Sequence, residues 1–428
     1  MPLLPTAHPD FIASVASSGA HWRWPTYAAS LSSDAKSPIL ASPLSQRLLG
    51  PLLPASFIEW RYYAVIADSF HGIVGLALVN PQDRFPMVAE SGLLLIIAGV
   101  FDRTGSEDTP AKNSRTATLQ ELCWMHLFPV ATCRFDGDDQ PHPEPEGLSA
   151  EHEGHRLCLR QPTPARAELQ LESSSGFRLQ MMHAGLDGST IEPMPGDDFA
   201  RLPGSHWLVH CPSPVAVTSG ELCIDPAAAE LLAPAAKPTE TRRASPALLK
   251  RIRAGDAKFH WQDANGYYEH SFGINPLPLF GWDFLFVPDA GRGQAVVMQT
   301  YRGSSQLRYV EVCWRDADQP RYHRFDAAQI SLDWTKREFD PVLGADRPLC
   351  RVIRAEAGGL RLHVENRVLH RIPLLRPRRL AVRHFFISEE IGVADWTLSN
   401  DQDSIIAKAR NQPCGSELAH FRWRTRIP

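Results

Sequence analysis

The sequence of 428 residues lacks the short motifs that mark the most familiar enzyme classes. It contains no Walker loop, dinucleotide-binding fingerprint, nucleophile elbow or zinc signature. The formal net charge is only −4, so no strongly basic surface for nucleic acid or anionic membrane is expected. The eight cysteines are scattered and form no C-x-x-C pair, which favours reduced, buried thiols over a disulfide scaffold. The functional residues must therefore be sought outside these motifs.

Long hydrophobic runs are also absent. The most apolar stretch, Gly92–Phe101, is about half the roughly 20 residues that a membrane-spanning helix needs, so we expect a buried strand or pair of strands there. The N-terminal M-P-L-L-P-T-A-H-P-D has neither a basic region nor a long apolar core, so a signal peptide is not expected. We expect a soluble, cytoplasmic protein without a transmembrane segment. Peripheral membrane contact and the oligomeric state stay open.

From residue 57 onward, apolar and polar residues alternate in short runs. In F-I-E-W-R-Y-Y-A-V-I-A, Ile58, Trp60 and Tyr62 fall on one face of a strand, and Glu59 and Arg61 fall on the other. Further runs of β-branched and aromatic residues are separated by turn residues, at the spacing expected of a β-sandwich or barrel. The sequence therefore predicts an all-β protein.

The length favours two domains, because one hydrophobic core rarely organises more than about 250–300 residues. The first 50 residues are rich in Pro, Ser and Ala, and a second change in composition, to an Ala- and Pro-rich stretch, follows residue 225. We divide the chain into an irregular N-terminal arm (1–50), a first β-barrel (51–225), a linker or insertion (226–258) and a second β-barrel (259–428).

The linker carries the signals of one short basic helix. Ser245 is a suitable N-cap, Pro246 suits the first helical position, and Gly255 suits the stop. Between them, A-L-L-K-R-I-R-A combines apolar residues with three basic ones. We therefore predict a helical insertion between two β-rich halves.

The stretch N-G-Y-Y-E-H-S-F-G, residues 265–273, places titratable groups beside aromatic rings. On a strand, Tyr268, His270 and Phe272 project one way, and Tyr267 and Glu269 project the other, so only one set can face a barrel lumen. Burial among rings would raise the pKa of the Glu and lower that of the His, which suits a general acid. Hydrogen bonds that hold a tight turn are the structural alternative. We favour His270 as the residue that faces the lumen.

Other aromatic and polar residues are candidates for substrate binding. The two histidines of H-W-L-V-H share one face of a strand, but no third ligand is visible nearby, so core or lumen histidines are favoured over a metal site. An aromatic stripe in the first strand, or an Asp that opens a strand, is more often a packing or turn-cap feature than a site. The candidates are Trp60, Tyr62, His206, His210, Phe272, Trp282, Asp283 and Tyr301, and no metal is expected.

G-Y-Y-E-H-S-F-G resembles the G-Y-x-D-H-N-W-G signature of the carotenoid 1,2-hydratase and AttH-like family. Its members share tandem lipocalin-like β-barrels, an architecture related to that of tocopherol cyclases and lipocalin-type Diels–Alderases. F-I-E-W-R-Y-Y-A-V resembles the E-W-W-Y opening strand of the family, and the segment that begins H-W-L-V-H resembles the one before the signature. Three residues differ from the family signature: Glu269 replaces Asp, Ser271 replaces Asn, and Phe272 replaces Trp. Trp is the better cation–π partner.

The resemblance implies two tandem lipocalin-like antiparallel β-barrels and a hydrophobic cavity for a polyene, a prenyl chain or a polyketide-like molecule. It implies cofactor-free, acid-initiated hydration or cyclisation of a C=C bond, a lyase or isomerase reaction of natural-product biosynthesis. Glu269 or His270 would donate the proton, and Tyr267 and Tyr268 would orient the donor. Two alternatives stay open. A Diels–Alderase-type pericyclase would mainly fold its substrate and would lose little activity without Glu269, and a lipocalin-like carrier would bind its ligand without catalysis.

Overall fold

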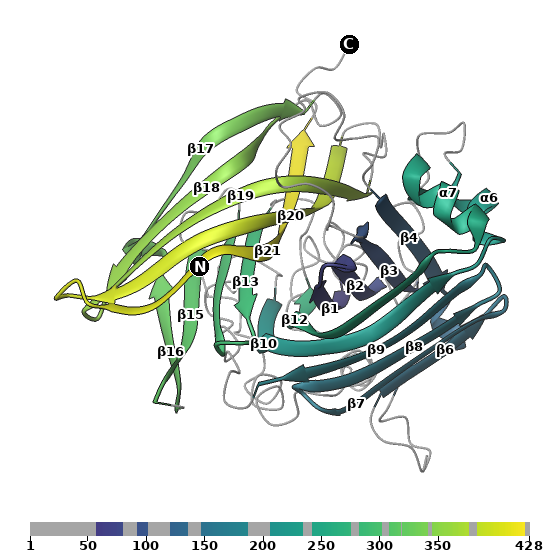
Figure 1. Ribbon diagram of the computed structural model, residues 1–428, viewed down its shortest axis with the longest axis horizontal. Coiled ribbons are helices and arrows are strands. Elements are labelled where there is room, and N and C mark those ends of the chain that lie inside the picture. The colour runs from purple at the N-terminus through teal and green to yellow at the C-terminus, as the bar shows by residue number, and fades with distance from the viewer. Residues whose placement is uncertain are drawn as a thin grey trace, which may run out of the picture.

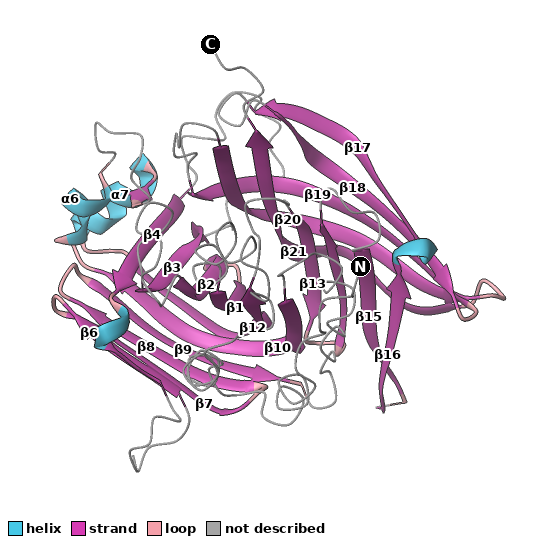
Figure 2. Ribbon diagram, turned by 180° about the vertical axis from the view of Figure 1, so that it is seen from behind, coloured by secondary structure: helices cyan, strands magenta, loops and turns pink. Residues whose placement is uncertain are grey.

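The computed structural model describes the chain as two curled antiparallel sheets that lie side by side (Figures 1 and 2). The fold is all-β, with two tandem lipocalin-like half-barrels, as the sequence predicts. No helix among the described residues is long and apolar enough to cross a membrane. The described residues are 57–79, 92–101, 120–135, 147–186, 206–233, 242–274, 282–301, 308–317, 319–340, 345–375 and 383–423.

The first sheet contains twelve strands in the order β11-β4-β3-β2-β1-β12-β10-β9-β8-β7-β6-β5. A 3₁₀ turn, η2 (Val130–Thr132), precedes β5. The strands are β1 (Phe57–Ile66), β2 (Phe70–Val79), β3 (Gly92–Phe101), β4 (Gln120–Phe128), β5 (Cys133–Phe135), β6 (Gly147–His152), β7 (His155–Thr163), β8 (Arg166–Ser173), β9 (Phe177–Gly185), β10 (His206–Ile224), β11 (Arg243–Ala244) and β12 (Lys258–Ile274).

The second sheet contains nine strands in the order β16-β15-β14-β13-β21-β20-β19-β18-β17. A 3₁₀ turn, η5 (Ala327–Gln329), connects β16 to β17, which form opposite edges of the sheet. The strands are β13 (Trp282–Asp289), β14 (Gln294–Tyr301), β15 (Arg308–Asp316), β16 (Gln319–Asp326), β17 (Ile330–Asp340), β18 (Ala345–Ala357), β19 (Leu360–Leu375), β20 (Arg383–Asn400) and β21 (Ile405–Trp423).

The motif strand β12 belongs to the first sheet, where it pairs with β1 and β10. The two sheets therefore divide between β12 and β13, later in the chain than residue 259, where we expected the second barrel to begin. The local pattern of a strand does not show which neighbour it will pair with, and this is why the expected position differs.

The predicted helix forms as α7 (Pro246–Ala254), and a shorter helix, α6 (Ala228–Leu232), precedes it. The Ser245 hydroxyl accepts a hydrogen bond from the Leu248 amide at 3.3 Å, and Gly255 ends the helix with a φ of 76°, which favours glycine. Its apolar side chains pack into the core of the first sheet, and the nearby β11 pairs with β4. Figure 1 shows both helices beside β4. The insertion is thus part of the first half-barrel.

Strands near the junction of the two sheets bury both faces, so apolar clusters form inside each sheet and between the two sheets. The continuous apolar run of β3 is an example, because a strand covered on both sides needs no polar face. The first interior contains Val74, Leu95, Trp124 and Phe259, and the second interior contains Leu285, Val310, Val364 and Trp396. The inter-sheet cluster contains Tyr62, Ile73, Ile96, Cys211, Tyr267, Phe284, Phe286, Val297, Ile387 and Ile391, drawn from both sheets.

Candidate active site

The alternation of β12 sends its chemical groups in two directions. Tyr268 packs in the first interior, with His270 on the same face, as we expected from the sequence. Tyr267, by contrast, belongs to the inter-sheet cluster, and Glu269 and Ser271 lie on its face of the strand. Both directions lead to buried surroundings, so the motif contributes to two separate polar groups.

In the first interior, the polar groups of the motif contact neighbouring polar side chains. His270 Nε2 lies 2.8 Å from Glu59 Oε1, and both side chains are buried. Gln161 Nε2 donates to the Tyr268 hydroxyl at 3.1 Å, and Arg61 donates to the oxygen of the same amide. Buried polar groups normally have such partners, so these contacts fit the structural interpretation of the motif on this face.

Glu269 faces the inter-sheet cluster and accepts two hydrogen bonds from its own strand. The Tyr267 hydroxyl donates to Oε2 at 3.0 Å, and the Ser271 hydroxyl donates to Oε1. These donors lie two residues before and after Glu269, which is the spacing that puts side chains on one face of a strand. Burial, followed by the charge of Glu417, raises the pKa of Glu269 to about 7 despite both hydrogen bonds.

Two adjacent carboxyls of the second sheet contact residues of the same cluster. Glu389 in β20 and Glu417 in β21 are direct cross-strand partners. The Tyr62 hydroxyl donates to Glu389 Oε2 at 2.6 Å, and Trp282 Nε1 donates to Glu417 Oε1. Among the described residues, Glu389 Oε1 and Glu417 Oε2 have no protein donor. A proton on one carboxyl lets the two hydrogen-bond to each other.

The electrostatics of this pair favour a bound proton. Burial first, and then the charge of Glu417, raise the pKa of Glu389 well above its ordinary value. Burial also raises the pKa of Glu417, although hydrogen bonds from Glu389 and Trp282 oppose the shift. Two adjacent buried carboxyls cannot both ionise easily, so they titrate as a pair that shares one proton. The pair therefore holds a proton to a higher pH than an isolated, exposed carboxyl does.

Aromatic rings surround these acids. Tyr267 stacks on Phe286 with ring centroids 4.6 Å apart, and Tyr62 meets the edge of Phe286 at 5.8 Å. The ring centroids of Tyr62 and Tyr267 are 6.2 Å apart, with the rings edge to face. The tyrosine that donates to Glu389 therefore packs against the tyrosine that donates to Glu269. The π face of an aromatic ring attracts a cation, most strongly where water is excluded. The inter-sheet face thus combines a proton source with groups that stabilise positive charge.

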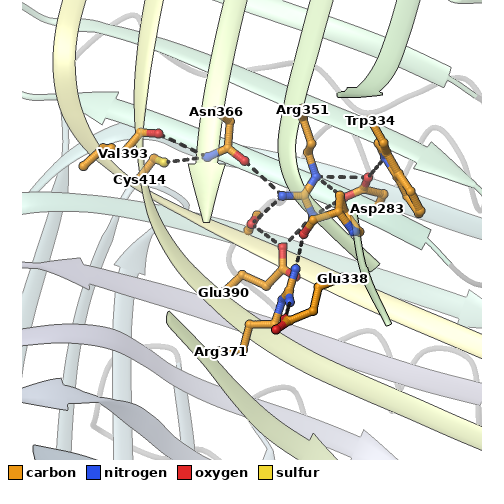
Figure 3. A network of polar contacts seen from close by, with 11 residues as sticks. Asp283, Trp334, Glu338, Arg351, Asn366, Arg371, Glu390, Val393 and Cys414 are labelled. Atoms are coloured by element: carbon orange, nitrogen blue, oxygen red, sulfur yellow. Dashed lines mark hydrogen bonds and ion pairs between the residues drawn. The ribbon is translucent and has the colours of Figure 1, made fainter. Parts of the chain in front are cut away.

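The second interior contains a different kind of polar network (Figure 3). Arg351 Nε donates to Asp283 Oδ1 at 2.8 Å, and Arg351 Nη2 donates to Glu390 Oε2 at 2.5 Å. Trp334 Nε1 donates to Asp283 at 3.2 Å, and Arg371 Nε donates to Glu390 at 2.6 Å. Burial opposes ionisation of Glu390, but the two guanidinium groups outweigh it and lower its pKa. This network is charge-balanced.

The structure brings some predicted residues together and separates others. Trp60 and Trp282 pack against the inter-sheet cluster, which Tyr62 joins directly. Asp283, adjacent to Trp282, points to the opposite face of β13 and binds Arg351. For four of the residues predicted to bind substrate, the strand backbone is described but the side chain is outside the described part. These are His206, His210, Phe272 and Tyr301.

Sequence reasoning missed Glu389 and Glu417. A signal was present, because I-S-E-E-I and G-S-E-L place carboxyls inside strands that are otherwise apolar. A buried carboxylate needs a partner, so such positions are unusual in a core. Which partner each carboxyl finds depends on the pairing of β20 with β21 and on the packing of the two sheets.

Comparisons with known proteins give likeness in fold alone. No family model matches the chain, and no curated protein matches its sequence. The crystal structure of CghA is 12% identical with a TM-score of 0.49, and the match covers 86% of this chain and 88% of that one. A putative AttH from Nitrosomonas europaea is 13% identical with a TM-score of 0.41, covering 85% and 92%. Kievitone hydratase from Nectria haematococca is 8% identical with a TM-score of 0.44, covering 88% and 93%.

Proposed function

We propose that this chain is an enzyme that binds a lipophilic substrate between its two sheets and protonates a C=C bond with the Glu389–Glu417 pair. The observation that carries the proposal is the pair itself, two adjacent buried carboxyls in an inter-sheet cluster that contains stacked aromatic rings. The reaction is hydration or cyclisation of a polyene, prenyl or polyketide-like intermediate. It needs no cofactor, because a carboxylic acid can supply the proton.

The proposed reaction begins with proton transfer from Glu389 to one alkene carbon. The C=C π electrons form the new C–H bond, the other carbon becomes a cation, and the pair is left with one more negative charge. The rings of Tyr62, Tyr267 and Phe286 stabilise that cation. Water attacks the cation in a hydration, or an internal hydroxyl attacks it in a cyclisation, and the attacking oxygen then loses a proton. An internal alkene that attacks instead forms a new C–C bond and a new cation, which loses a proton from a neighbouring carbon. In either case one proton is released, which balances the one that Glu389 gave up.

Glu269 suits the acceptor role in the capture step. With a pKa of about 7 it is partly ionised at neutral pH, and the hydroxyls of Tyr267 and Ser271 hold its oxygens in place. A carboxylate in that state can take a proton from the attacking water or hydroxyl. When the surroundings of two carboxyls give them different pKa values, one commonly acts as the acid and the other as the base. Glu389 and Glu269 fit that pattern.

The test is an incubation in D₂O with three probes: an acyclic carotenoid, a prenylated phenol and a linear polyketide triene. Proton-initiated chemistry puts one deuterium on carbon, which mass spectrometry and NMR detect. The proposal expects a hydrated or cyclised product with that label, and loss of the product in Glu389→Gln. An unlabelled cyclic product that persists in Glu389→Gln would show a pericyclase instead. Tight retention of a probe with no product at any protein concentration would show a carrier.

A further inference from the structure

Three half-buried polar residues meet where the insertion, the first sheet and the second sheet come together. Arg243 Nη2 in β11 lies 3.1 Å from Glu121 Oε1 in β4, and His370 Nε2 in β19 lies 2.9 Å from Glu121 Oε2. Between 15% and 24% of each side chain is exposed, so these residues, which we call the rim group, stay within reach of solvent. The acid–base roles proposed above leave all three unused.

The rim group lies on the inter-sheet face of the first sheet. Glu121 shares its face of β4 with Cys123 and Met125, and both of these belong to the inter-sheet cluster. Arg243 is the cross-strand partner of Cys123, so it projects from the same face. The rim group is therefore a polar margin of the apolar inter-sheet surface.

The rim group is also close to the carboxyl pair. In β19, His370 and Ile372 point to one face, and Ile372 is the cross-strand partner of Glu389. His370 is paired with Ile391, which makes it a diagonal neighbour of Glu389. Diagonal neighbours on one face of an antiparallel pair lie roughly 7–8 Å apart. A molecule held at the rim group can therefore extend to the proposed acid.

Arg243 has hydrogen-bond donors that the described residues do not use. Its Nε donates to Glu121 Oε1 at 3.2 Å. Its two terminal nitrogens are shielded from solvent, yet neither has a hydrogen-bond acceptor among the described residues, since the short contact of Nη2 with the carboxylate lacks hydrogen-bond geometry. Buried donors without an acceptor are costly, and a guanidinium presents its N–H groups in a planar fork. The unused donors indicate a site for an acceptor group of a ligand.

The insertion fixes the position of this guanidinium. The Ser245 amide donates to the Glu121 carbonyl at 2.9 Å, and the Glu121 amide donates to the Ser245 hydroxyl at 3.0 Å. Ser245 is also the N-cap of α7, so the helix start and the carboxylate are held together. Burial opposes ionisation of Glu121, but the hydrogen bond from His370 and the charge of Arg243 outweigh it and lower its pKa. The carboxylate thus stays ionised and orients Arg243.

We propose that the rim group binds an acidic end of the lipophilic substrate, a carboxylate, enolate or phenolate, through the terminal nitrogens of Arg243. The apolar remainder of the substrate lies along the inter-sheet cluster. Two parallel N–H groups of a guanidinium match the two oxygens of a carboxylate. Glu121 balances one positive charge, and a protonated His370 adds a second, so the group can take up one negative charge. The assignment rests on the proposed function, which it deepens by giving the substrate an acidic end.

The test compares the binding of parinaric acid, a fluorescent tetraene carboxylic acid, with that of its methyl ester, using the full chain at neutral pH. Fluorescence titration measures both dissociation constants. The ester keeps the apolar tail but not the charge, so the wild type is expected to bind the acid about tenfold more tightly, the low end of what a hydrogen bond to a charged group contributes. Arg243→Met is expected to abolish that preference while the affinity for the ester stays the same.

Two further variants separate the charge, the fork and the fold. Arg243→Lys, which keeps the charge but not the planar fork, is expected to retain part of the preference, and its result does not depend on the folding of Arg243→Met. Arg253→Met, at an exposed arginine of α7, is the matched control and should retain all of it.

Equal affinities of the wild type for the acid and the ester, or a full preference for the acid in Arg243→Met, would overturn the rim site. Neither result bears on proton transfer by Glu389, which the deuterium-labelling reaction tests. A labelled product together with equal affinities would therefore overturn the rim site alone. A tenfold preference that disappears in Arg243→Met, together with an unlabelled product, would overturn the proposed acid alone.

Discussion

Glu389 and Glu390 are neighbours in β20, and both are buried, yet their proton affinities shift in opposite directions. Glu390 points into the second interior, where Arg351 and Arg371 bind it and lower its pKa. Glu389 points to the inter-sheet face, where its nearest charged partner is another carboxyl and its pKa rises. Burial is equal at the two sites, so the difference comes from the sign of the neighbouring charge.

The comparison separates a structural network from a chemical one. In the second interior, each charge has an opposite charge within hydrogen-bond distance, and such a balanced group holds strands together. On the inter-sheet face, hydroxyl and indole donors hold the carboxyls in place without neutralising them. In each of β13, β20 and β21, a residue of the Arg351 network lies next to a residue of the inter-sheet carboxyl group. Adjacent residues of a strand point to opposite faces, so the two groups lie on opposite sides of the same strands.

The largest effect on stability is expected from Arg351→Met. This change leaves Asp283 and Glu390 buried without their main cation, and loss of one partner of a buried pair costs about 3–5 kcal/mol. Urea unfolding monitored by circular dichroism measures the loss. The matched control is Arg354→Met, three residues later on the surface, where the ion pair with Asp333 is exposed and should contribute less than about 1 kcal/mol. Equal losses in the two variants would contradict the structural role of the network.

The largest effect on turnover is expected from Glu389→Gln. An amide cannot donate the proton, so the deuterium-labelling reaction should slow about 10²–10⁴-fold while the free energy of unfolding stays equal or rises. Glu390→Gln, at the next residue, should show the reverse, with a large loss of stability because Arg351 and Arg371 lose a carboxylate. Equal changes of turnover and equal changes of the free energy of unfolding in the two variants would contradict the different roles assigned to the two faces.

The pH dependence of stability should also differ between carboxyls with raised and with lowered pKa values. A carboxyl with a raised pKa binds more protons in the folded state, so Glu269 lowers the free energy of unfolding as pH rises from the unfolded value of 4.5 through about 7. Glu390, with a lowered pKa, loses its contribution below pH 4.5 instead. The free energy of unfolding, measured with urea, should fall across this pH range by roughly 3 kcal/mol or less for each inter-sheet carboxyl. It should fall less steeply in Glu269→Gln. An identical slope in that variant would show that Glu269 ionises normally.

A smaller effect is expected from Tyr62→Phe, which keeps the ring but removes the hydroxyl that donates to Glu389. The lost hydrogen bond should cost about 1 kcal/mol of stability. That bond lowers the pKa of Glu389, so its removal should shift the alkaline limb of the pH–rate profile upward. Tyr63→Phe is the control, because its hydroxyl lies in the first interior, 3.5 Å from Gln161. A shift in both profiles, or in neither, would argue against a direct contact between Tyr62 and the acid.

Local features of the fold followed directly from the sequence. The N-cap Ser245 and the stop Gly255 identified α7, because capping depends only on residues within one turn of the helix end. The uniformly apolar run Gly92–Phe101 identified a buried strand for a similar reason. The sheet to which β12 belongs was not predictable in the same way, since strand pairing joins residues that are far apart in the chain.

The candidate site was only half visible in the sequence. Glu269 and Tyr267 stood out because their motif mixes rings with titratable groups, and they do lie among the buried acids. Glu389 and Glu417 stood out less, because a single Glu within an apolar strand has no local companion. His270, which we favoured as the residue that faces the lumen, pairs with Glu59 on the opposite face of β12 from Glu269. Its role in catalysis stays a prediction.

By itself, the sequence determined which side chains share a face, because alternation along a strand is a property of the backbone geometry. It separated Tyr268 and His270 from Tyr267 and Glu269 before any sheet was known. Only the tertiary structure decided what each face would meet. The pairing of β20 with β21 places Glu417 beside Glu389, and the packing of the two sheets brings the charge of Glu417 to bear on Glu269. Proton affinity depends on such neighbours, so the acid on the inter-sheet face is a product of the fold.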